Sequence, residues 1–337
     1  MREHHRSITT RLAVGAVGVV AAGLLVGCGK AGSSGTQAPP NDASGPGCAP
    51  VAGTQLVVLE DNKRLQNTDN VIPAVNAEVA TPELLAALDK VSTSLDTPKL
   101  IALNKAVTID RKSSRVAAEE FAAANNLTSG IAKGAGGEVI VGAANFPESE
   151  TLAELYRIAL NAAGYSAKVR KIGNRELYEP ALEKGEIQVV PEYAATMADF
   201  LNGKVNGRNA SVISSPDLTH TVNGLKAVGE KVGITFGVPS PAQNQNAFAV
   251  TREFAEKYGV TTLTELAEKC SGRATVLGGP PECPQRPKCQ AGLVEVYDFR
   301  AGAFSSLDAG GPQTKNALRR GEISVGLVLS SDAELAN

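Results

Sequence analysis

The stretch from residue 138 to residue 164 constrains the fold more than any other part of the sequence. It begins with a β-branched run, Val139 to Val141, which ends at Gly142. Such a run is typical of a buried strand. After a short loop, apolar residues recur at helical spacing until Gly164, a residue that suits a helix end. These apolar positions are Leu152, Leu155, Tyr156, Ala159, Leu160 and Ala163.

The loop between this strand and this helix is a candidate ligand-binding turn. Asn145 and Ser149 are available as helix caps, and Pro147 suits a first helical turn. A strand, a polar loop and a helix N-terminus together place backbone N–H groups toward a ligand. The alternative is an ordinary βα unit of an α/β domain, which the pattern alone favours.

The first 27 residues predict an export signal rather than part of the fold. A basic start is followed by an apolar run from Leu12 to Val26, which is too short to span a membrane as a stable helix. The run ends in Leu-Val-Gly-Cys, which resembles the bacterial lipobox, so we expect lipidation at Cys28. The alternative is a secretory signal with a coincidental cysteine. Residues 28–50 are rich in Gly, Ser, Pro and Ala and predict a flexible tether.

Composition describes a globular protein with room for two lobes. The chain has 337 residues, of which 43% are hydrophobic and 20% charged. The net charge of −2 gives no reason to expect a nucleic-acid partner. Only 4% of the residues are aromatic and none is Trp, so each aromatic side chain near a cleft is a candidate for binding.

The turn from Gly142 to Glu148 resembles the opening of a known family. It reads GAANFPE and is similar to the G-S-K-x-F-x-E turn of the substrate-binding proteins of osmoprotectant ABC importers, the glycine betaine, carnitine and choline type. The resemblance implies an α/β, two-lobed periplasmic-binding-protein fold of type II. It implies a protein that captures a small osmolyte-like solute between its lobes and delivers it to a permease and its ATPase. The family opening normally follows the export signal closely, whereas here it lies more than a third of the way along.

The order of the segments predicts a circular permutation. Residues 56–127, with LVVLE and TPELLAAL, resemble the carboxy-terminal end of the family, and GEISV at 321–325 resembles the segment that usually precedes it. The usual order would be 138–337 followed by 56–127, with 128–137 as the new linker. The alternative is a fused fragment of a second binding domain. We expect lobe 1 over 70–240 and lobe 2 over 48–69 and 241–337.

The resemblance also implies site residues. The turn after a predicted strand at 187–190 resembles the family's E-Y-x-G-T, which gives Tyr193 as an aromatic wall and Thr196 as a contact for a ligand carboxylate. The loop at 278–286 resembles the one that carries a carboxylate-clamping arginine, here Arg286, and a guanidinium suits a carboxylate well. The alternatives are a rim tyrosine and a surface arginine that holds its own loop.

Most of the family's expected cage aromatics are absent, so the ligand stays open. Asn246 and Leu329 occupy two of those positions, and Thr314 or Lys315 falls near a third. The lysine of the family turn is replaced by Ala144. A quaternary ammonium needs ring faces, which Phe146 or Tyr178 would have to supply. The polar side chains of Asn244, Asn246, Ser330 and Ser331 instead suggest a pocket that binds its ligand through hydrogen bonds. The candidate binding set is Asn145, Phe146, Tyr193, Thr196, Asn244, Asn246, Arg286 and Ser330.

Four cysteines remain besides Cys28, an even number that suggests disulfides in an exported protein. Three connectivities are possible. Cys283 and Cys289 bracket a Pro-rich loop and favour a local pair, which leaves Cys48 with Cys270. Metal binding is the competing interpretation, but no His lies nearby.

Nothing in the sequence favours an enzyme or a cofactor. Outside the signal the only His is His220, and no Ser or Cys carries a nucleophile motif. We expect no catalytic residue, no metal and no cofactor, and a monomer anchored by its lipid on the extracytoplasmic face of the cell membrane. The rival hypothesis is a lipid-anchored sensory or scaffolding protein with the same fold and no transport role.

Overall fold

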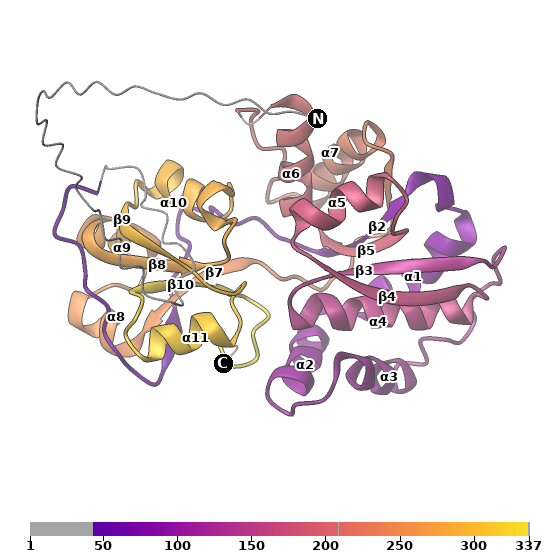
Figure 1. The fold of residues 1–337 in the computed structure, drawn as a ribbon, viewed down its shortest axis with the longest axis horizontal. Coiled ribbons are helices and arrows are strands. Elements are labelled where there is room, and N and C mark those ends of the chain that lie inside the picture. Colours follow the sequence, from indigo (N-terminus) through magenta and orange to yellow (C-terminus); the bar gives the residue numbers. More distant parts are fainter. Residues whose placement is uncertain (1–42, 208, 336–337) are drawn as a thin grey trace, which may run out of the picture. The chain divides into compact units, whose positions relative to one another are not determined.

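The fold comes from a computed structural model that describes residues 43–207 and 209–335 (Figure 1). The predicted lipidation site Cys28 and the signal lie outside these residues. In the described part of the chain, no helix is long and apolar enough to cross a membrane. The strands form two separate five-stranded sheets. The helices are α1 (Pro82–Ser94), α2 (Thr97–Thr108), α3 (Ser114–Ala124), α4 (Pro147–Ala162), α5 (Arg175–Glu183), α6 (Ala194–Asn206), α7 (Leu218–Glu230), α8 (Arg252–Tyr258), α9 (Leu263–Cys270), α10 (Gln290–Tyr297) and α11 (Pro312–Arg319).

The first sheet has the order β4-β3-β5-β2-β6. β3 runs parallel to β4 and β5, whereas β2 is antiparallel to both β5 and β6. We call the body built on this sheet lobe 1. Its strands are β2 (Val71–Asn76), β3 (Glu138–Ala144), β4 (Ser166–Gly173), β5 (Val189–Tyr193) and β6 (Ile234–Phe236).

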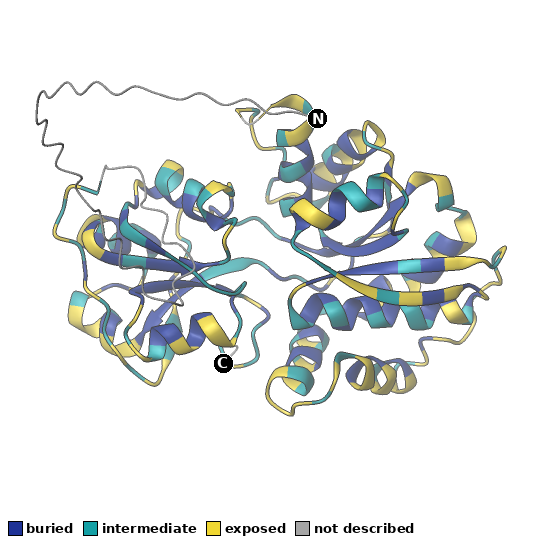
Figure 2. Ribbon diagram, in the orientation of Figure 1, coloured by how far each residue is buried: buried dark blue, intermediate teal, exposed yellow. Residues whose placement is uncertain are grey.

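Helices cover both faces of this sheet because its strands are apolar on both sides. Val139 and Val141 of β3 pack in the core beneath α1, α2, α3 and α4, whereas Ile140 packs against the core on the opposite face, beneath α5, α6 and α7. The central strands β2, β3 and β5 are accordingly the most continuously buried part of the lobe, whereas the edge strand β4 and the outer helix faces are largely exposed or half-buried (Figure 2). The result is the α/β layering that the βα unit at 138–164 predicts.

The second sheet has the order β1-β7-β10-β8-β9 and forms lobe 2. β8 runs parallel to β9 and β10, whereas β7 is antiparallel to β10 and β1. Alternation again divides its core, since Leu327 packs on the side of α8, α9 and α10 and Val328 on the side of α11. The strands are β1 (Leu56–Val58), β7 (Asn246–Thr251), β8 (Gly272–Gly279), β9 (Ala301–Ser306) and β10 (Val325–Leu329).

Two connections join the sheets, one from β1 to β2 and one from β6 to β7. They pair with each other where they cross: Asn70 and Gln243 form an antiparallel bridge, and the backbone N–H of Asn244 donates to the carbonyl of Asp69 at 2.9 Å. Two sheets with helices on both faces, joined by a pair of crossing segments, make the two-lobed fold that the resemblance implies.

Several local expectations need correction. Pro191 to Tyr193 belong to β5 rather than to a turn, and Thr196 lies in the first turn of α6. The N-cap of α4 is Phe146, without a side-chain cap, so neither Asn145 nor Ser149 caps that helix. The Ser149 hydroxyl instead accepts a hydrogen bond from the backbone N–H of Ala144 at 2.9 Å, which ties the helix start to the strand end.

Both expected disulfides are present. Cys48 pairs with Cys270, which fastens the segment before β1 to the end of α9. Cys283 pairs with Cys289 and closes the loop between β8 and α10. This second bond holds the backbone on either side of Arg286.

Candidate functional site

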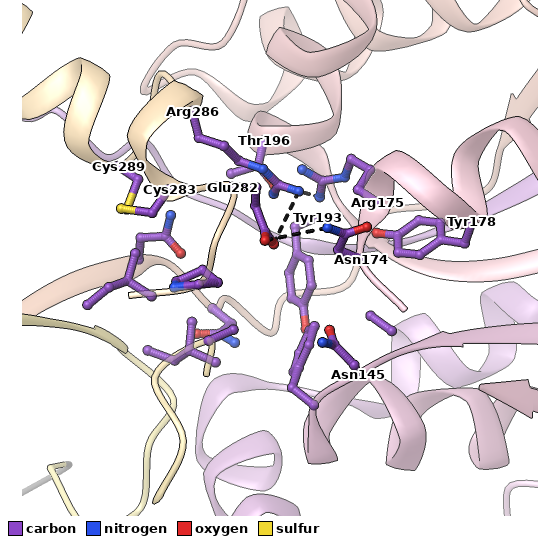
Figure 3. A pocket seen from close by; sticks show the side chains of 18 residues that line it. Asn145, Asn174, Arg175, Tyr178, Tyr193, Thr196, Glu282, Cys283, Arg286 and Cys289 are labelled. Atoms are coloured by element: carbon purple, nitrogen blue, oxygen red, sulfur yellow. Dashed lines mark hydrogen bonds and ion pairs between the residues drawn. A yellow bond between two sulfur atoms is a disulfide. The ribbon is translucent and has the colours of Figure 1, made fainter. Parts of the chain in front are cut away.

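Residues from both lobes line a cavity of about 100 Å³ (Figure 3). Lobe 1 contributes side chains from the ends of β3 and β5 and from the starts of α5 and α6, while lobe 2 contributes the loop after β8 and the end of β10. The lining is Ala144, Asn145, Phe146, Asn174, Arg175, Tyr178, Tyr193, Thr196, Asn244, Asn246, Pro280, Glu282, Cys283, Arg286, Cys289, Ala309, Leu327 and Leu329. We refer to it as the main pocket.

Two aromatic rings stand together in this lining. Phe146 precedes α4 and Tyr193 ends β5, and their ring centroids lie 6.4 Å apart with an interplanar angle of 28°. The Tyr193 hydroxyl donates to Oε1 of Glu148 at 2.5 Å. Burial, and next the Glu148 carboxylate, raise the pKa of Tyr193 well above its usual value, so the hydroxyl keeps its proton. The ring rather than the proton is what Tyr193 offers to a ligand.

Glu148 is the centre of a buried polar cluster behind Tyr193. Its Oε1 also accepts from Nδ2 of Asn244 at 2.7 Å. Its Oε2 accepts from Nδ2 of Asn104 at 2.5 Å and from the hydroxyl of Ser331 at 2.6 Å. Asn104 belongs to α2, Asn244 to a crossing segment, and Ser331 follows β10 of lobe 2. A single carboxylate therefore connects the aromatic wall to both lobes.

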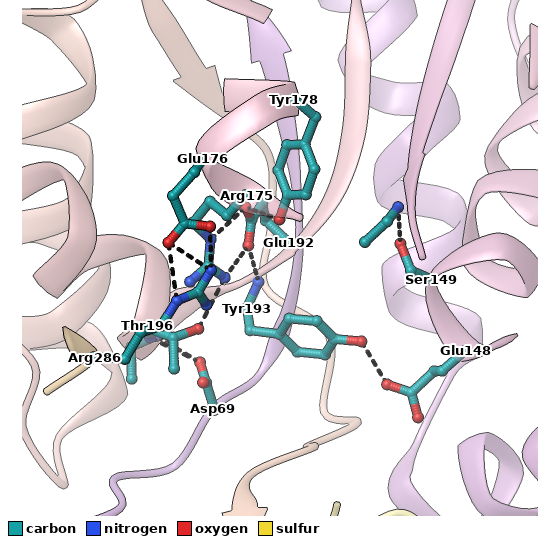
Figure 4. A network of polar contacts seen from close by, with 12 residues as sticks. Asp69, Glu148, Ser149, Arg175, Glu176, Tyr178, Glu192, Tyr193, Thr196 and Arg286 are labelled. Carbon is teal, nitrogen blue, oxygen red and sulfur yellow. Dashed lines mark hydrogen bonds and ion pairs between the residues drawn. The ribbon is translucent and has the colours of Figure 1, made fainter. Parts of the chain in front are cut away.

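An arginine–carboxylate pair forms the floor of the main pocket (Figure 4). Arg175, the first residue of α5, binds Glu192 of β5 through two parallel bonds of 2.8 and 2.6 Å, and the two side chains are 6% and 0% exposed. The Tyr178 hydroxyl donates to Glu192 at 2.7 Å, and Arg175 donates to the Thr196 hydroxyl at 3.0 Å. The side chains of the floor therefore bond to one another, with Glu192 accepting from Arg175 and Tyr178 and with Thr196 accepting from Arg175.

Asp69 supports this floor from a crossing segment. Its Oδ1 accepts from the backbone N–H groups of Ala195 and Thr196 at 2.7 and 3.3 Å, at the start of α6. Burial raises the pKa of Asp69 to about 7, against the opposing effects of Arg175 and the two backbone donors. This carboxyl therefore titrates near neutral pH.

A second arginine lies at the rim of the main pocket and joins the lobes. Arg286 binds Glu176 of α5 in a fork, with its Nη2 at 2.7 Å from Oε2 and its Nε at 3.1 Å from Oε1, and the side chains are 25% and 40% exposed. Burial acts to raise the pKa of Glu176, but the bonds and charge of Arg286 lower it below its usual value. Glu282 lies 3.7 Å from the same guanidinium and accepts from Asn174 at 3.4 Å.

Seven of the eight predicted binding residues line the main pocket: Asn145, Phe146, Tyr193, Thr196, Asn244, Asn246 and Arg286. Ser330 does not. It is exposed, and its hydroxyl accepts a hydrogen bond from the backbone N–H of Gln245 at 2.8 Å. The buried serine at the end of β10 is its neighbour Ser331.

The positions that the resemblance assigns to cage aromatics and to the turn lysine are filled in different ways. Asn246 donates to the backbone carbonyl of Lys288 at 3.0 Å, and Leu329 and Ala144 add apolar lining. Lys315 lies 2.8 Å from Asp332 and lines a second cavity of about 50 Å³ that also borders Glu148. Thr314 bonds to Asp308 and lines neither cavity.

The groups that hold the site in shape are held by tertiary contacts and are not evident from local sequence patterns. Arg175, Asp69 and Asn104 carry no spacing signal, because each finds its partners through the tertiary fold. Glu192 is the first residue of the segment that resembles E-Y-x-G-T, although nothing local gave it a role. Glu148 was visible as the last residue of the turn motif, although nothing local gave it a role. Among the residues that the structure describes, no group of three or more His, Cys, Asp or Glu side chains is placed to hold a metal ion.

Several solved structures are remotely similar to this chain. The murein tripeptide binding protein MppA of Escherichia coli matches at 10% identity and a TM-score of 0.26, over 55% of this chain and 44% of that one. OppA of Haemophilus influenzae, in complex with the peptide RPPGFSPFR, matches at 10% identity and a TM-score of 0.27, over 55% of this chain and 44% of that one. The binding protein MoaA of A. tumefaciens R10, in complex with mannopinic acid, matches at 11% identity and a TM-score of 0.25, over 55% of this chain and 45% of that one. The chain therefore spans less than half the length of these structures.

Comparison with protein families is decisive, although no curated protein matches the chain. The model of the substrate-binding domain of ABC-type glycine betaine transport systems matches residues 50–124 and 137–337. These two ranges cover both lobes and leave out the segment between α3 and β3. The chain therefore belongs to the family of substrate-binding domains of ABC-type glycine betaine transport systems.

Proposed function

We propose that this protein captures a small osmolyte-like solute in the main pocket and delivers it to an ABC importer. The observation that carries the proposal is the composition of the pocket, whose lining joins a lobe 1 ring pair, Phe146 and Tyr193, to a lobe 2 arginine, Arg286. Solute-binding proteins of this architecture hold their ligand by closing two lobes around it. Family membership supports the same role.

The chemistry of the pocket favours a solute with a cationic head group and a carboxylate, such as a betaine. Ring faces attract a cation that cannot donate hydrogen bonds, and each ring contributes roughly 0.5–2 kcal/mol. The Tyr193 hydroxyl is engaged by Glu148, which leaves its ring as the contact surface. Arg286 forks to a carboxylate in the rim pair with Glu176, the same chemistry that a ligand carboxylate would present.

Titration calorimetry of the purified protein tests this proposal. The panel comprises glycine betaine, choline, carnitine, amino acids and polyols. We expect measurable heat with the quaternary ammonium compounds and the tightest binding with those that also carry a carboxylate. Binding of polyols alone, or of none of these solutes, would contradict the proposed ligand class.

We further propose that a lipid on Cys28 holds the protein at the extracytoplasmic face of the membrane, next to its permease and ATPase. The support is the lipobox-like sequence before Cys28. Replacing Cys28→Ser should release the protein from the membrane fraction into the medium. Unchanged membrane retention of that variant would contradict the anchor.

The chain order is also, by our inference, a circular permutation of the family order. In support, Leu335 near the end of the chain and Leu56 at the start of β1 pack against the same small core of lobe 2. Arg319 links the same two regions, because it donates to the carbonyl of Thr54 at 3.3 Å and pairs with Glu334 at 2.7 Å. The family match leaves out 125–136, which overlaps the predicted linker.

A reordered chain tests this inference. Residues 138–337 would be joined directly to residue 56, and the chain would be opened within 128–137. We expect a folded protein with the solute affinity of the original. A reordered chain that fails to fold would contradict the permutation.

A further inference from the structure

Glu148 carries a full set of hydrogen bonds from uncharged donors. Each carboxylate oxygen accepts two bonds of 2.5–2.7 Å, from Tyr193 and Asn244 on one and from Asn104 and Ser331 on the other. A carboxyl whose two oxygens both accept in this way is suited to its ionised form. The side chain is 4% exposed and sits in the first turn of α4, where the helix dipole also favours a negative charge.

These four bonds stabilise a negative charge on Glu148. Because all four donors are uncharged, they do not neutralise it. Lys315 lines the same second cavity, but it is bound to Asp332 at 2.8 Å and to Glu334 at 3.0 Å. On the other side, the carboxylate touches Tyr193, whose ring lines the main pocket. Glu148 thus lies at the hydroxyl end of the Tyr193 ring (Figure 4).

Two effects carry this charge into the main pocket. A phenol that donates to a carboxylate has a more electron-rich ring, and the electrostatic attraction of a cation depends on the negative ring face. The carboxylate also acts directly, since unit charges about 7–12 Å apart at an effective dielectric constant of about 20 change an affinity by about 10- to 50-fold.

We propose that Glu148 is the residue that makes this pocket select a cationic head group, acting through the Tyr193 ring and through its own charge without touching the solute. The proposal rests on the proposed function, because it concerns the same pocket and its ligand class. It explains how a site in which only one ring pair, Phe146 and Tyr193, is stacked would select a cation without a full aromatic cage. Glu148 is in this sense a specificity-determining residue.

Pairs of ligands that differ only in one atom test the proposal. Glycine betaine and 3,3-dimethylbutanoate have the same shape, as do choline and 3,3-dimethylbutan-1-ol, with nitrogen replaced by carbon. Calorimetry on the full protein gives an affinity ratio for each pair. We expect wild type to favour the ammonium member and Glu148→Gln to reduce that ratio by about 10- to 50-fold.

A matched control separates charge from structure. Ser331→Ala removes one hydrogen bond to the same carboxylate but keeps the charge, so we expect it to leave both ratios within about twofold of wild type, even where it weakens all four affinities. Thermal melts confirm that both variants are folded.

The possible results separate the role of Glu148 from the proposed function of the pocket. A Glu148→Gln variant that weakens both members of a pair equally would overturn the role of Glu148 and leave the proposed function standing. A Ser331→Ala variant that lowers the ratio as much would also overturn it, because the hydrogen-bond arrangement rather than the charge would then be responsible. Wild-type protein with no preference for the ammonium member would overturn both the role of Glu148 and the proposed ligand class.

Discussion

Two arginine–carboxylate pairs of the same chemistry lie at the floor and at the rim of the main pocket. Both are forked, with shortest distances of 2.6 Å for Arg175–Glu192 and 2.7 Å for Arg286–Glu176. They differ in surroundings, since the floor pair is almost completely buried within lobe 1 whereas the rim pair is a quarter to two fifths exposed and joins the two lobes.

This difference in burial gives the pairs different tasks. A buried pair that loses one partner leaves an uncompensated charge in the interior, so the floor pair is fixed once the lobe has folded. A partly exposed pair contributes about 0–1 kcal/mol, because water and salt screen it and either group can be solvated alone. Under the proposed function, the rim arginine would exchange Glu176 for a ligand carboxylate at little cost. The floor shapes the pocket, and the rim is available for recognition.

Breaking the floor pair should have the largest effect. Arg175→Ala leaves Glu192 buried and unpaired, and we expect the free energy of unfolding to fall by about 3–5 kcal/mol. Arg286→Ala at the rim should change it by no more than about 1 kcal/mol. Urea denaturation followed by circular dichroism measures both. Equal losses in the two variants would remove the distinction between floor and rim.

The floor should also make stability depend on pH through Asp69. Its pKa of about 7 in the folded protein lies above the usual 3.8, so the folded state binds the proton more tightly than the unfolded chain does. The resulting stabilisation is complete below pH about 4 and is lost as pH rises to about 7, up to about 4 kcal/mol. Asp69→Asn, which keeps an oxygen for the backbone donors, should remove this decline. Denaturation at a series of pH values tests it, and parallel curves for wild type and variant would contradict it.

At the rim, the expected loss is in affinity rather than in stability. Arg286→Ala should weaken binding of a carboxylate-bearing solute by about 2 kcal/mol, at the lower end for truncated charge pairs because the side chain is partly exposed. Arg286→Lys should recover only part of this, since an ammonium cannot form the fork. Calorimetry with glycine betaine against choline, which lacks the carboxylate, provides the comparison. A loss of equal size for choline would show that Arg286 acts in some other way.

The smallest effect should come from the partner of the rim arginine. Glu176→Gln removes the charge that competes for Arg286, so we expect affinity for a carboxylate solute to rise by up to about 1 kcal/mol. The same calorimetric titration measures it. A decrease in affinity would mean that the rim pair holds the lobes together around the solute instead of yielding to it.

The elements that form the site were largely predictable from sequence, whereas their long-range partners were not. Phe146, Tyr193 and Arg286 lie in segments whose resemblance to the family's motifs pointed to them, and all three line the main pocket. The floor pair joins residues 17 positions apart on different elements, and its burial results from packing that no local pattern records. Asp69 and Asn104 likewise gain their roles only after the chain has folded.

At the end of β10, Ser330 rather than its neighbour Ser331 was predicted as a binding residue, and the cause lies in strand geometry. Successive residues of an extended chain point to opposite sides, so a shift of one position exchanges a buried side chain for an exposed one. Ser330 is exposed and Ser331 is fully buried against Glu148. Both serines were visible in the sequence, but the register that separates them is set by the pairing of β10 with β7 and β8.

A crystal structure of the protein with bound glycine betaine tests the central claim most directly. We expect the trimethylammonium group to lie against the faces of Phe146 and Tyr193, the carboxylate to lie in the fork of Arg286, and Glu176 to be released from that fork. The floor pair of Arg175 and Glu192 should be unchanged. A structure in which the solute binds elsewhere, or in which Arg286 still holds Glu176 while the solute occupies the main pocket, would contradict it.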